Sequence, residues 1–186
     1  VLKSMSHTSF SDLQKRLKAN KLPLGVTSLL YGAPGTGKTE TVYQIAKKYN
    51  RPIFKVEIAE TKSMWFGESQ KLVKKIFTDY YEFKKDEKVC PILLFNEADA
   101  IIGKRKNAGS TSVADTENAI QNILLEELEN FNGILFATSN LVNNLDPAFE
   151  RRFLFKIKFD TPSPENAAKI WKSKLTMISN KQALIL

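Results

Sequence analysis

The chain has 186 residues, of which 42% are hydrophobic and 26% charged, and its formal net charge is +8; this suits one α/β core of a globular protein with part of a second small domain. No run reaches the roughly 18 apolar residues that cross a membrane, and the first residues lack the apolar segment of a signal peptide. The single cysteine, Cys90, excludes an internal disulfide and favours a cytoplasmic location, and the single histidine, His7, leaves too few ligands for a zinc site of the usual kind.

The sequence then alternates between short apolar runs and longer helical patterns. Residues 1–27 are expected to form a polar lead-in, in which Phe10, Leu13 and Leu17 have the spacing of a short helix. The runs that have the length and composition of strands are residues 28–31, 53–58, 92–95, 134–138 and 153–159. The first four are apolar enough to be buried, whereas the last alternates as a strand with one polar side.

Three apolar stripes at helical spacing separate these runs. They comprise Val42, Ile45, Ala46 and Tyr49, then Leu72, Val73, Ile76, Phe77, Tyr80 and Tyr81, and finally Ile120, Leu124, Leu128 and Phe131. Strands that alternate with helices predict right-handed crossovers and a five-stranded parallel sheet with helices on both faces, which is a three-layer α/β fold. A further helix begins near Pro164 and stops without closing a second core.

The segment from Gly32 to Thr39, GAPGTGKT, follows the first predicted strand and precedes a helix. This is the P-loop pattern, whose glycines let backbone N–H groups surround phosphates without Cβ clashes. Lys38 supplies charge to the terminal phosphates and the Thr39 hydroxyl can bind Mg²⁺, while the helix N-terminus favours the anion. The segment therefore predicts a site for ATP and Mg²⁺. Its candidate nucleotide-binding residues are Pro34, Gly35, Thr36, Gly37, Lys38, Thr39 and Glu40.

The predicted strand at residues 92–95 is followed by Asn96 and Glu97. In a parallel α/β sheet, such residues emerge at the carboxyl edge beside the nucleotide. Glu97 is the candidate general base, since a carboxylate there can orient and deprotonate the attacking water. Most P-loop ATPases have Asp where this chain has Asn96. Asn96 is a candidate metal-site residue whose oxygen can accept a hydrogen bond from a metal-bound water but carries no charge to offset Mg²⁺.

Three interpretations of Asn96 remain open. It is a natural variant in an enzyme that hydrolyses ATP, or it marks a subunit that binds ATP and scarcely turns it over, or it is an engineered change that traps the nucleotide. The residue types alone do not decide between them.

Five features occur in an order that gives a specific resemblance. They are GAPGTGKT at 32–39, MWFGES at 64–69, FNEAD at 95–99, ATSN at 137–140 and DPAFERRF at 146–153. From about residue 23 to residue 162, the chain resembles the AAA+ ATPases, in particular the AAA clade that includes valosin-containing-protein-like unfoldases and the severing enzymes katanin and spastin. The resemblance implies a P-loop NTPase fold, with a large ATPase subdomain at 28–162 and the beginning of a helical lid, incomplete in this chain, at 163–186.

The resemblance also implies catalytic roles. Asn140 stands where AAA proteins keep a polar residue that senses the terminal phosphate and orients water. Arg151 and Arg152 match the paired arginines that one subunit presents to the nucleotide of its neighbour, where an arginine stabilises charge on the phosphoryl group.

Two further segments resemble the pore loops of AAA rings. Trp65, Phe66 and Gly67 match the aromatic loop that lines the central pore, followed by a helix start at Glu68; the alternative is that the two aromatic side chains belong to the core. The polar segment at residues 103–112 falls where the family has a second pore loop.

Together these features imply a ring ATPase, expected to be a hexamer of identical subunits, that hydrolyses ATP to remodel or unfold polypeptide substrates. Two other classes of function remain open. An AAA+ protein that acts on nucleic acid is favoured by the net charge of +8, although lysines scattered over predicted helices are more typical of solvated faces. A nucleotide-gated scaffold would follow if Asn96 abolishes turnover.

Overall fold

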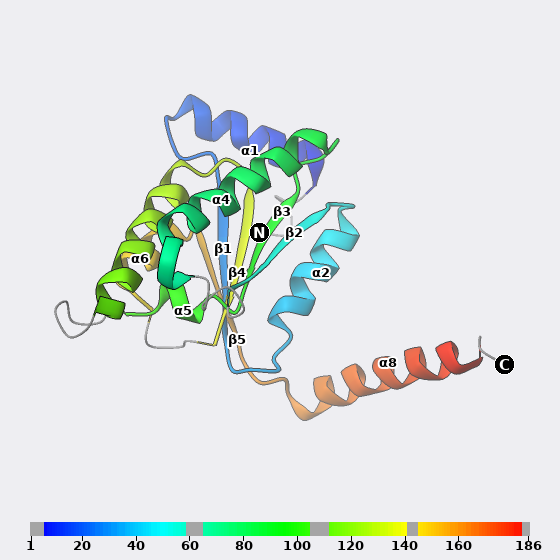
Figure 1. Cartoon of the computed structure of the whole chain (residues 1–186). Helices are drawn as coiled ribbons and strands as arrows, with labels where there is room; N and C mark the ends of the chain where they lie inside the picture. Colours follow the sequence, from blue (N-terminus) through cyan, green and yellow to red (C-terminus); the bar gives the residue numbers. More distant parts are fainter. Residues whose placement is uncertain (1–5, 59–64, 105–111, 141–144, 184–186) are drawn as a thin grey trace.

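The computed structural model describes residues 6–58, 65–104, 112–140 and 145–183 (Figure 1). Within these residues, five strands form one sheet in the order β2-β3-β4-β1-β5, and every pairing is parallel. The strands are β1 Val26–Gly32, β2 Ile53–Glu57, β3 Ile92–Asn96, β4 Ile134–Ser139 and β5 Phe155–Phe159. The carboxyl ends of these strands therefore lie on one edge, and the predicted five-stranded parallel sheet is confirmed.

Helices connect the strands, as the alternation of patterns predicts. They are α1 His7–Ala19, α2 Lys38–Lys48, α4 Trp65–Asp86, α5 Asp99–Ile102, α6 Ser112–Asn130, α7 Pro147–Arg152 and α8 Pro164–Ala183. The three predicted apolar stripes lie on α2, α4 and α6, with Tyr49 and Phe131 directly after the last residue of their helices. The short α7 has a local start signal, because Asp146 accepts a hydrogen bond from the Ala148 N–H at 2.7 Å and Pro147 occupies the first helical position.

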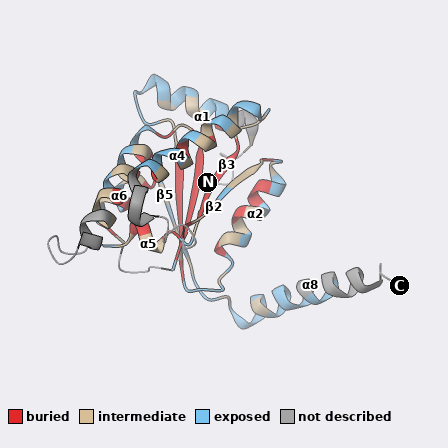
Figure 2. Cartoon of the chain, in the orientation of Figure 1, coloured by how far each residue is buried: buried red, intermediate tan, exposed pale blue. Residues whose placement is uncertain are grey.

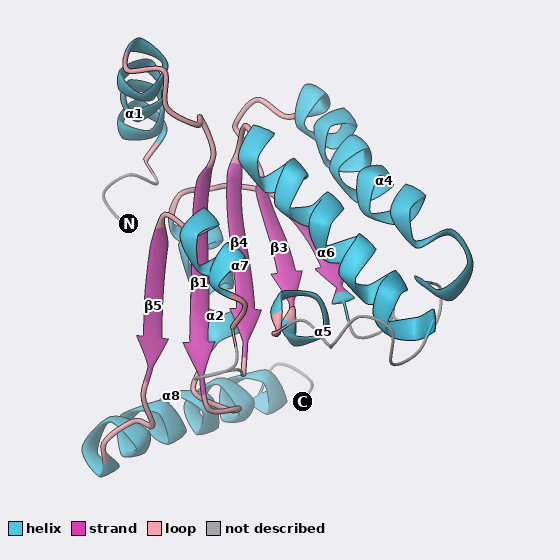
Figure 3. Cartoon of the chain, turned by 90° about the vertical axis from the view of Figure 1, so that its left-hand side faces the viewer, coloured by secondary structure: helices cyan, strands magenta, loops and turns pink. Residues whose placement is uncertain are grey.

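Alternate residues of the central strands point to opposite faces of the sheet. Leu93 and Phe95 pack in one buried cluster with residues of α4, α5, α6 and α7, whereas Ile92 and Leu94 pack in a second cluster with residues of α1 and α2. Figure 2 shows the central strands as the buried layer, and Figure 3 shows α4 and α6 in front of the sheet with α2 behind it. This is the predicted three-layer arrangement.

Two strands begin at residues other than the expected 28 and 153, each for a local reason, and four strand ends differ from those expected by one residue. β1 begins at Val26, because the Val26 N–H donates to the Gly133 carbonyl at 2.8 Å and the side chain is fully buried. β5 begins at Phe155, because α7 continues to Arg152. The predicted alternation of β5 is observed as half-buried residues separated by exposed ones.

The first and last helices pack differently. Phe10 of α1 is buried in the cluster that contains α2, so this predicted helix is part of the folded core. α8 leaves the body of the molecule beyond the carboxyl edge of the sheet (Figure 1), and its Ile170, Trp171 and Leu175 are exposed. In the part of the chain that the structure describes, no helix combines the length and the apolar character needed to cross a lipid bilayer.

Candidate nucleotide-binding site

The loop between β1 and α2 follows a path that requires glycine. Gly35 and Gly37 have φ angles of 76° and 89°, in the left-handed region that residues with a Cβ rarely adopt. At Gly32, φ is 148°, and a Cβ would lie 2.1 Å from the carbonyl oxygen of Phe159 on β5. This path brings the N-terminus of α2, which begins at Lys38, to the carboxyl edge of the sheet, where its unpaired N–H groups can bind an anion.

The ammonium group of Lys38 lies at the centre of the site. Its Nζ donates to the carbonyl oxygens of Gly32 at 2.9 Å and Ala33 at 2.8 Å, and to Oδ1 of Asn140 at 3.0 Å. Burial lowers the pKa of Lys38, and two nearby carboxylates oppose that shift. The charged group is therefore surrounded by oxygen acceptors. The oxygens of a terminal phosphate are also suited to accept hydrogen bonds from it.

Asn96, at the end of β3, contacts three side chains. Its Oδ1 accepts hydrogen bonds from Thr39 Oγ1 at 2.8 Å and from Thr138 Oγ1 at 3.0 Å, and its Nδ2 donates to Glu57 Oε2 at 2.8 Å. The two candidate metal-site residues, Thr39 and Asn96, are thus in direct contact. Glu57 also forms an ion pair with Lys55, and the hydrogen bonds from Lys55 and Asn96 lower the pKa of the Glu57 carboxyl.

Glu97 lies at the turn that leaves β3. Its φ of 54° is in the left-handed region, which residues other than glycine rarely adopt. Backbone strain of this kind is concentrated at functional sites in proteins. The turn is held to β4, because the Glu97 N–H donates to Thr138 Oγ1 at 3.0 Å and the Ala98 N–H donates to the Thr138 carbonyl at 2.9 Å. The position of Glu97 is therefore set by two strands rather than by the turn alone.

Asp99, in the first turn of α5, holds Asn140. Its carboxylate accepts hydrogen bonds from the backbone N–H of Asn140 at 2.9 Å, from Asn140 Nδ2 at 3.3 Å and from Ser139 Oγ at 2.5 Å. Because Nδ2 of Asn140 points to a carboxylate, its Oδ1 is the atom that faces Lys38. The amide orientation of Asn140 is thus fixed from both ends.

These groups meet in one pocket of about 320 Å³ at the carboxyl edge of the sheet. The residues that line it are Pro34, Gly35, Gly37, Lys38, Thr39, Glu40, Glu97, Thr138, Ser139 and Asn140. Of the other predicted residues of this site, Asn96 is not among the lining residues but bonds to Thr39, and the Thr36 hydroxyl donates to Ala33 O at 2.8 Å within the loop. The structure therefore brings the phosphate loop, the acidic strand end and Asn140 together.

Four polar residues of this site are absent from the predicted set. They are Glu57, Asp99, Thr138 and Ser139. Three of them end a buried strand or follow it in the first helical turn after it, and Glu57 ends the edge strand β2. A polar residue at the carboxyl end of a parallel strand, or in the turn that follows it, is the signal that could have identified all four.

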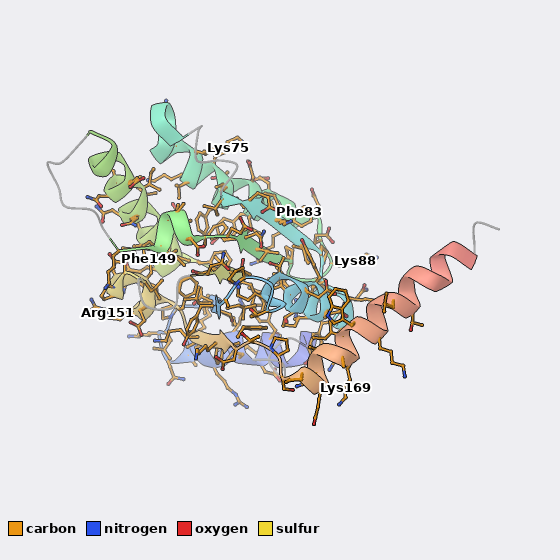
Figure 4. All side chains as sticks on the ribbon, turned by 90° about the horizontal axis from the view of Figure 1, so that it is seen from below. Lys75, Phe83, Lys88, Phe149, Arg151 and Lys169 are labelled. Carbon is orange, nitrogen blue, oxygen red and sulfur yellow. The ribbon has the colours of Figure 1, made fainter. Side chains whose placement is uncertain are left out.

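Arg151 and Arg152, at the end of α7, do not line this pocket. They line a second pocket of about 310 Å³, to which Thr27 at the amino end of β1 also contributes. Arg151 is exposed, with its Nε donating to Pro147 O at 3.3 Å, whereas Arg152 forms an ion pair with Glu129 of α6. Figure 4 shows Arg151 at the periphery of the molecule, on the side opposite the projecting part of α8.

Trp65, Phe66 and Gly67 lie in the first turn of α4, which begins three residues before the expected start at Glu68. Their side chains are outside the described part of the chain, as are residues 105–111 of the second predicted pore loop. The roles of both segments stay predictions.

Comparison with known sequences adds independent information. The sequence profile of the ATPase family associated with various cellular activities (AAA) matches residues 28–161. The chain is 28% identical to the Pachytene checkpoint protein 2 homolog of Xenopus tropicalis, in a match that covers 95% of this chain and 45% of that protein. It is 33% identical to the 26S proteasome regulatory subunit 7 homolog of Saccharomyces cerevisiae, with coverage of 81% and 32%.

A solved structure has the same fold. The crystal structure of the FIGL-1 AAA domain in complex with ADP superimposes with a TM-score of 0.66 at 22% identity, covering 94% of this chain and 56% of that one. At this identity the likeness shows the fold alone. The chain spans less than half the length of the two curated relatives described above.

Proposed function

Because the chain belongs to the AAA family of ATPases, we propose that it binds ATP with Mg²⁺ and hydrolyses the nucleotide to remodel protein substrates. One of its relatives is named as a regulatory subunit of the 26S proteasome, which supports a protein as the substrate. The single cysteine, Cys90, supports a cytoplasmic location as part of the same proposal.

In this proposal, residues 34–40 bind the phosphates, and Thr39 and Asn96 hold Mg²⁺. The Thr39 hydroxyl would be the ligand, while Asn96 accepts a hydrogen bond from that hydroxyl and would orient water on the ion. The donor set fits the metal, because Mg²⁺ prefers oxygen ligands and keeps several waters of its own. Mg²⁺, when bound, neutralises charge on the terminal phosphates.

Glu97 and Asn140 are the proposed hydrolytic residues. Glu97 is among the residues that line the pocket. Its carboxylate serves as the base that takes a proton from the attacking water. Asn140, fixed between Lys38 and Asp99, orients that water and contacts the terminal phosphate. A rigid amide at this point costs no reorganisation during the reaction.

The proposal includes a hexameric ring of identical subunits. In this ring, Arg151 and Arg152 stabilise the phosphoryl group bound to a neighbouring subunit. Their position supports this role, because they line a different pocket from the nucleotide pocket of their own chain. Trp65, Phe66 and Gly67 then line the central pore and grip extended polypeptide.

One observation carries the proposal. Lys38 bonds to Asn140 and Thr39 bonds to Asn96, so the phosphate loop is in direct contact with the ends of both β3 and β4. A loop that only bound phosphate would not need a carboxylate and an orienting amide in the same pocket.

The test is Mg²⁺-dependent phosphate release by the full-length protein over a range of protein concentrations. We expect turnover per subunit to rise with concentration, because a neighbouring subunit completes each site. Turnover should vanish in Glu97→Gln, which keeps the size of the side chain but removes the base. The matched control is Glu126→Gln on the exposed side of α6, which should hydrolyse ATP as the wild type does. Undiminished turnover in Glu97→Gln would contradict the proposed hydrolase.

The neutral Asn96 supports a second candidate, in which the chain is a scaffold that ATP binding switches between states of assembly. Tight ATP binding and assembly without phosphate release would favour it. Recovery of turnover in Asn96→Asp would then identify the missing charge as the cause.

Nucleic acid remains the third candidate, on the basis of the net charge of +8. Several lysines pair with acids on their own helices, as in Lys75–Asp79 and Lys85–Glu82, which is typical of solvated faces. Binding to single- or double-stranded DNA that weakens with added salt would favour this candidate, and the absence of binding at low salt would count against it.

A further inference from the structure

Three side chains fix the orientation of the Asn96 amide group. Thr138 Oγ1 accepts a hydrogen bond from the Glu97 N–H and donates one to Asn96 Oδ1, 3.0 Å away. Thr39 Oγ1 donates to the same oxygen at 2.8 Å. The amide nitrogen lies 2.8 Å from Oε2 of Glu57, and a carboxylate oxygen can only accept. The amide oxygen therefore points toward Thr39, and the amide nitrogen points toward Glu57.

Glu57 is placed there by the sheet. It is the last residue of β2 and stands opposite Asn96, the last residue of β3, in the parallel register. Lys55 of the same strand pairs with the other carboxylate oxygen, Oε1, and its ammonium group lies 5.9 Å from the centre of the Tyr43 ring on α2. One carboxylate oxygen is thus directed at Lys55 and the other at Asn96.

We propose that Glu57 is a positioning residue for Mg²⁺ that acts through Asn96, supplying the negative charge that Asn96 lacks and holding its amide oxygen toward the metal. The inference rests on the proposed binding of ATP with Mg²⁺. The hydrogen bond to Glu57 polarises the amide, which makes its oxygen a stronger acceptor. Thr39 can then donate a hydrogen bond to Asn96 while a lone pair of the hydroxyl oxygen binds the ion.

The same contact accounts for a neutral residue at position 96. An Asp there would put a second carboxylate within hydrogen-bonding distance of Glu57, and two like charges that close oppose each other's ionisation. The pair of Asn96 and Glu57 instead contains a single carboxylate, that of Glu57. A carboxylate thus lies on the neighbouring strand, where it pairs with Lys55 and accepts the hydrogen bond from Asn96.

The test measures how much Mg²⁺ the full-length protein needs for tight binding of a fluorescent ATP analogue. We expect Glu57→Gln to raise the Mg²⁺ concentration at half-maximal effect by about 10-fold or more, since residues that hold a metal ligand in place commonly contribute about 10- to 100-fold to metal affinity. Binding of the analogue in EDTA should not change, because the charge acts on the metal. Glu82→Gln, which removes an exposed ion pair with Lys85 on α4, is the matched control and should change neither quantity.

A double variant separates charge from packing. Glu57→Gln combined with Asn96→Asp moves the carboxylate from β2 to β3 and keeps a hydrogen bond between the two residues, since the Gln amide can donate to Asp. We expect it to recover the wild-type requirement for Mg²⁺. Failure to recover, or an unchanged requirement in Glu57→Gln alone, would overturn the role of Glu57. An equal loss of binding with and without Mg²⁺ would also overturn it, because that result indicates a structural role only.

The proposed function has a separate outcome in the same assay. If the wild-type protein does not bind the analogue, or binds it without regard to Mg²⁺, then the proposed function and the role of Glu57 both fail. If the wild type responds to Mg²⁺ and Glu57→Gln responds identically, only the role of Glu57 fails.

Discussion

At the scale of single residues, nucleotide binding depends first on Lys38. The Lys38 residue is buried, and its ammonium group donates to two carbonyl oxygens of the loop and to Asn140. We expect Lys38→Ala to weaken ATP binding by about 100-fold or more, because each hydrogen bond from a charged group contributes about 1.5–3 kcal/mol and more than one is lost. Titration calorimetry of the full-length protein measures the effect.

The matched control is Lys47→Ala, which removes an exposed lysine from the last turn of the same helix. This variant should bind ATP with wild-type affinity. An equally small effect of Lys38→Ala would mean that the phosphate loop is not the nucleotide site.

Asp99 makes a second prediction at this scale, because it determines which way the Asn140 amide points. An Asn at this position has one oxygen that can accept hydrogen bonds, and its N–H₂ group would face the donors of Ser139 or Asn140. Asp99→Asn therefore disrupts at least one of the three hydrogen bonds. We expect kcat for ATP hydrolysis to fall by about 10-fold or more while KM changes little, since the loss concerns the orientation of water rather than phosphate binding. Steady-state phosphate release measures both constants.

Asp79→Asn is the control for Asp99→Asn, because Asp79 forms an exposed ion pair with Lys75 on α4. A rise in KM with unchanged kcat in Asp99→Asn would instead assign Asp99 to nucleotide binding.

Residues in a continuous motif could be predicted from the sequence, whereas residues that depend on strand register could not. The phosphate loop is one continuous segment, so its chemistry can be predicted from the residue spacing alone. Glu57 and Asn96 are 39 positions apart, and they meet only because β2 and β3 pair in one particular register. Asp99 and Asn140 are 41 positions apart, and Asn140 was identified by family resemblance rather than by its neighbours.

At the scale of elements, apolar periodicity predicted which helix faces are buried. All six residues of the predicted stripe on α4 pack in or against one core cluster. Periodicity did not predict how the last helix packs, because Ile170 and Trp171 are apolar and yet exposed on α8. Their environment depends on what lies next to the helix, and a pattern within the helix carries no information about that.

α1 gives the prediction at this scale, because the sequence alone presents it as a lead-in. Phe10 is 5% exposed, and the Arg51 guanidinium lies 5.2 Å from the centre of its ring. We expect Phe10→Ala to lower the free energy of unfolding by about 3–5 kcal/mol, as is typical when a buried Phe is truncated. Urea denaturation of the full-length protein measures the change.

Leu22→Ala is the matched control, since Leu22 is apolar but 53% exposed, and its effect should stay within about 0.5 kcal/mol. Equal stabilities of the two variants would mean that α1 is not part of the cooperative core.

At the scale of the whole molecule, no arginine is among the described residues that line the nucleotide pocket. The two candidates lie in another pocket, and they are not equivalent. Arg152 pairs with Glu129, and its backbone carbonyl accepts a hydrogen bond from Thr27 Oγ1 at 2.8 Å, so it is built into the subunit. Arg151 is exposed. Of the two, Arg151 is therefore the better candidate to reach a neighbouring nucleotide.

This difference predicts complementation between two inactive variants. Arg151→Ala should lower kcat by about 1,000-fold, as removal of an arginine finger does, and Glu97→Gln should be inactive for lack of a base. In a mixed ring, an Arg151→Ala subunit keeps Glu97 and receives the intact Arg151 of a Glu97→Gln neighbour. An equal mixture in random order gives about a quarter of its sites both groups. Phosphate release by the mixture should therefore far exceed the sum of the two separate rates.

The control mixture replaces Glu97→Gln by a variant that carries both Glu97→Gln and Arg151→Ala, so that no subunit can donate the arginine. It should show no gain, because every site then lacks the neighbour's guanidinium. A gain in the first mixture and none in the second would establish that hydrolysis occurs between subunits. Equal rates in both would mean that Arg151 does not act across an interface, and its exposed position at the end of α7 would then need another explanation.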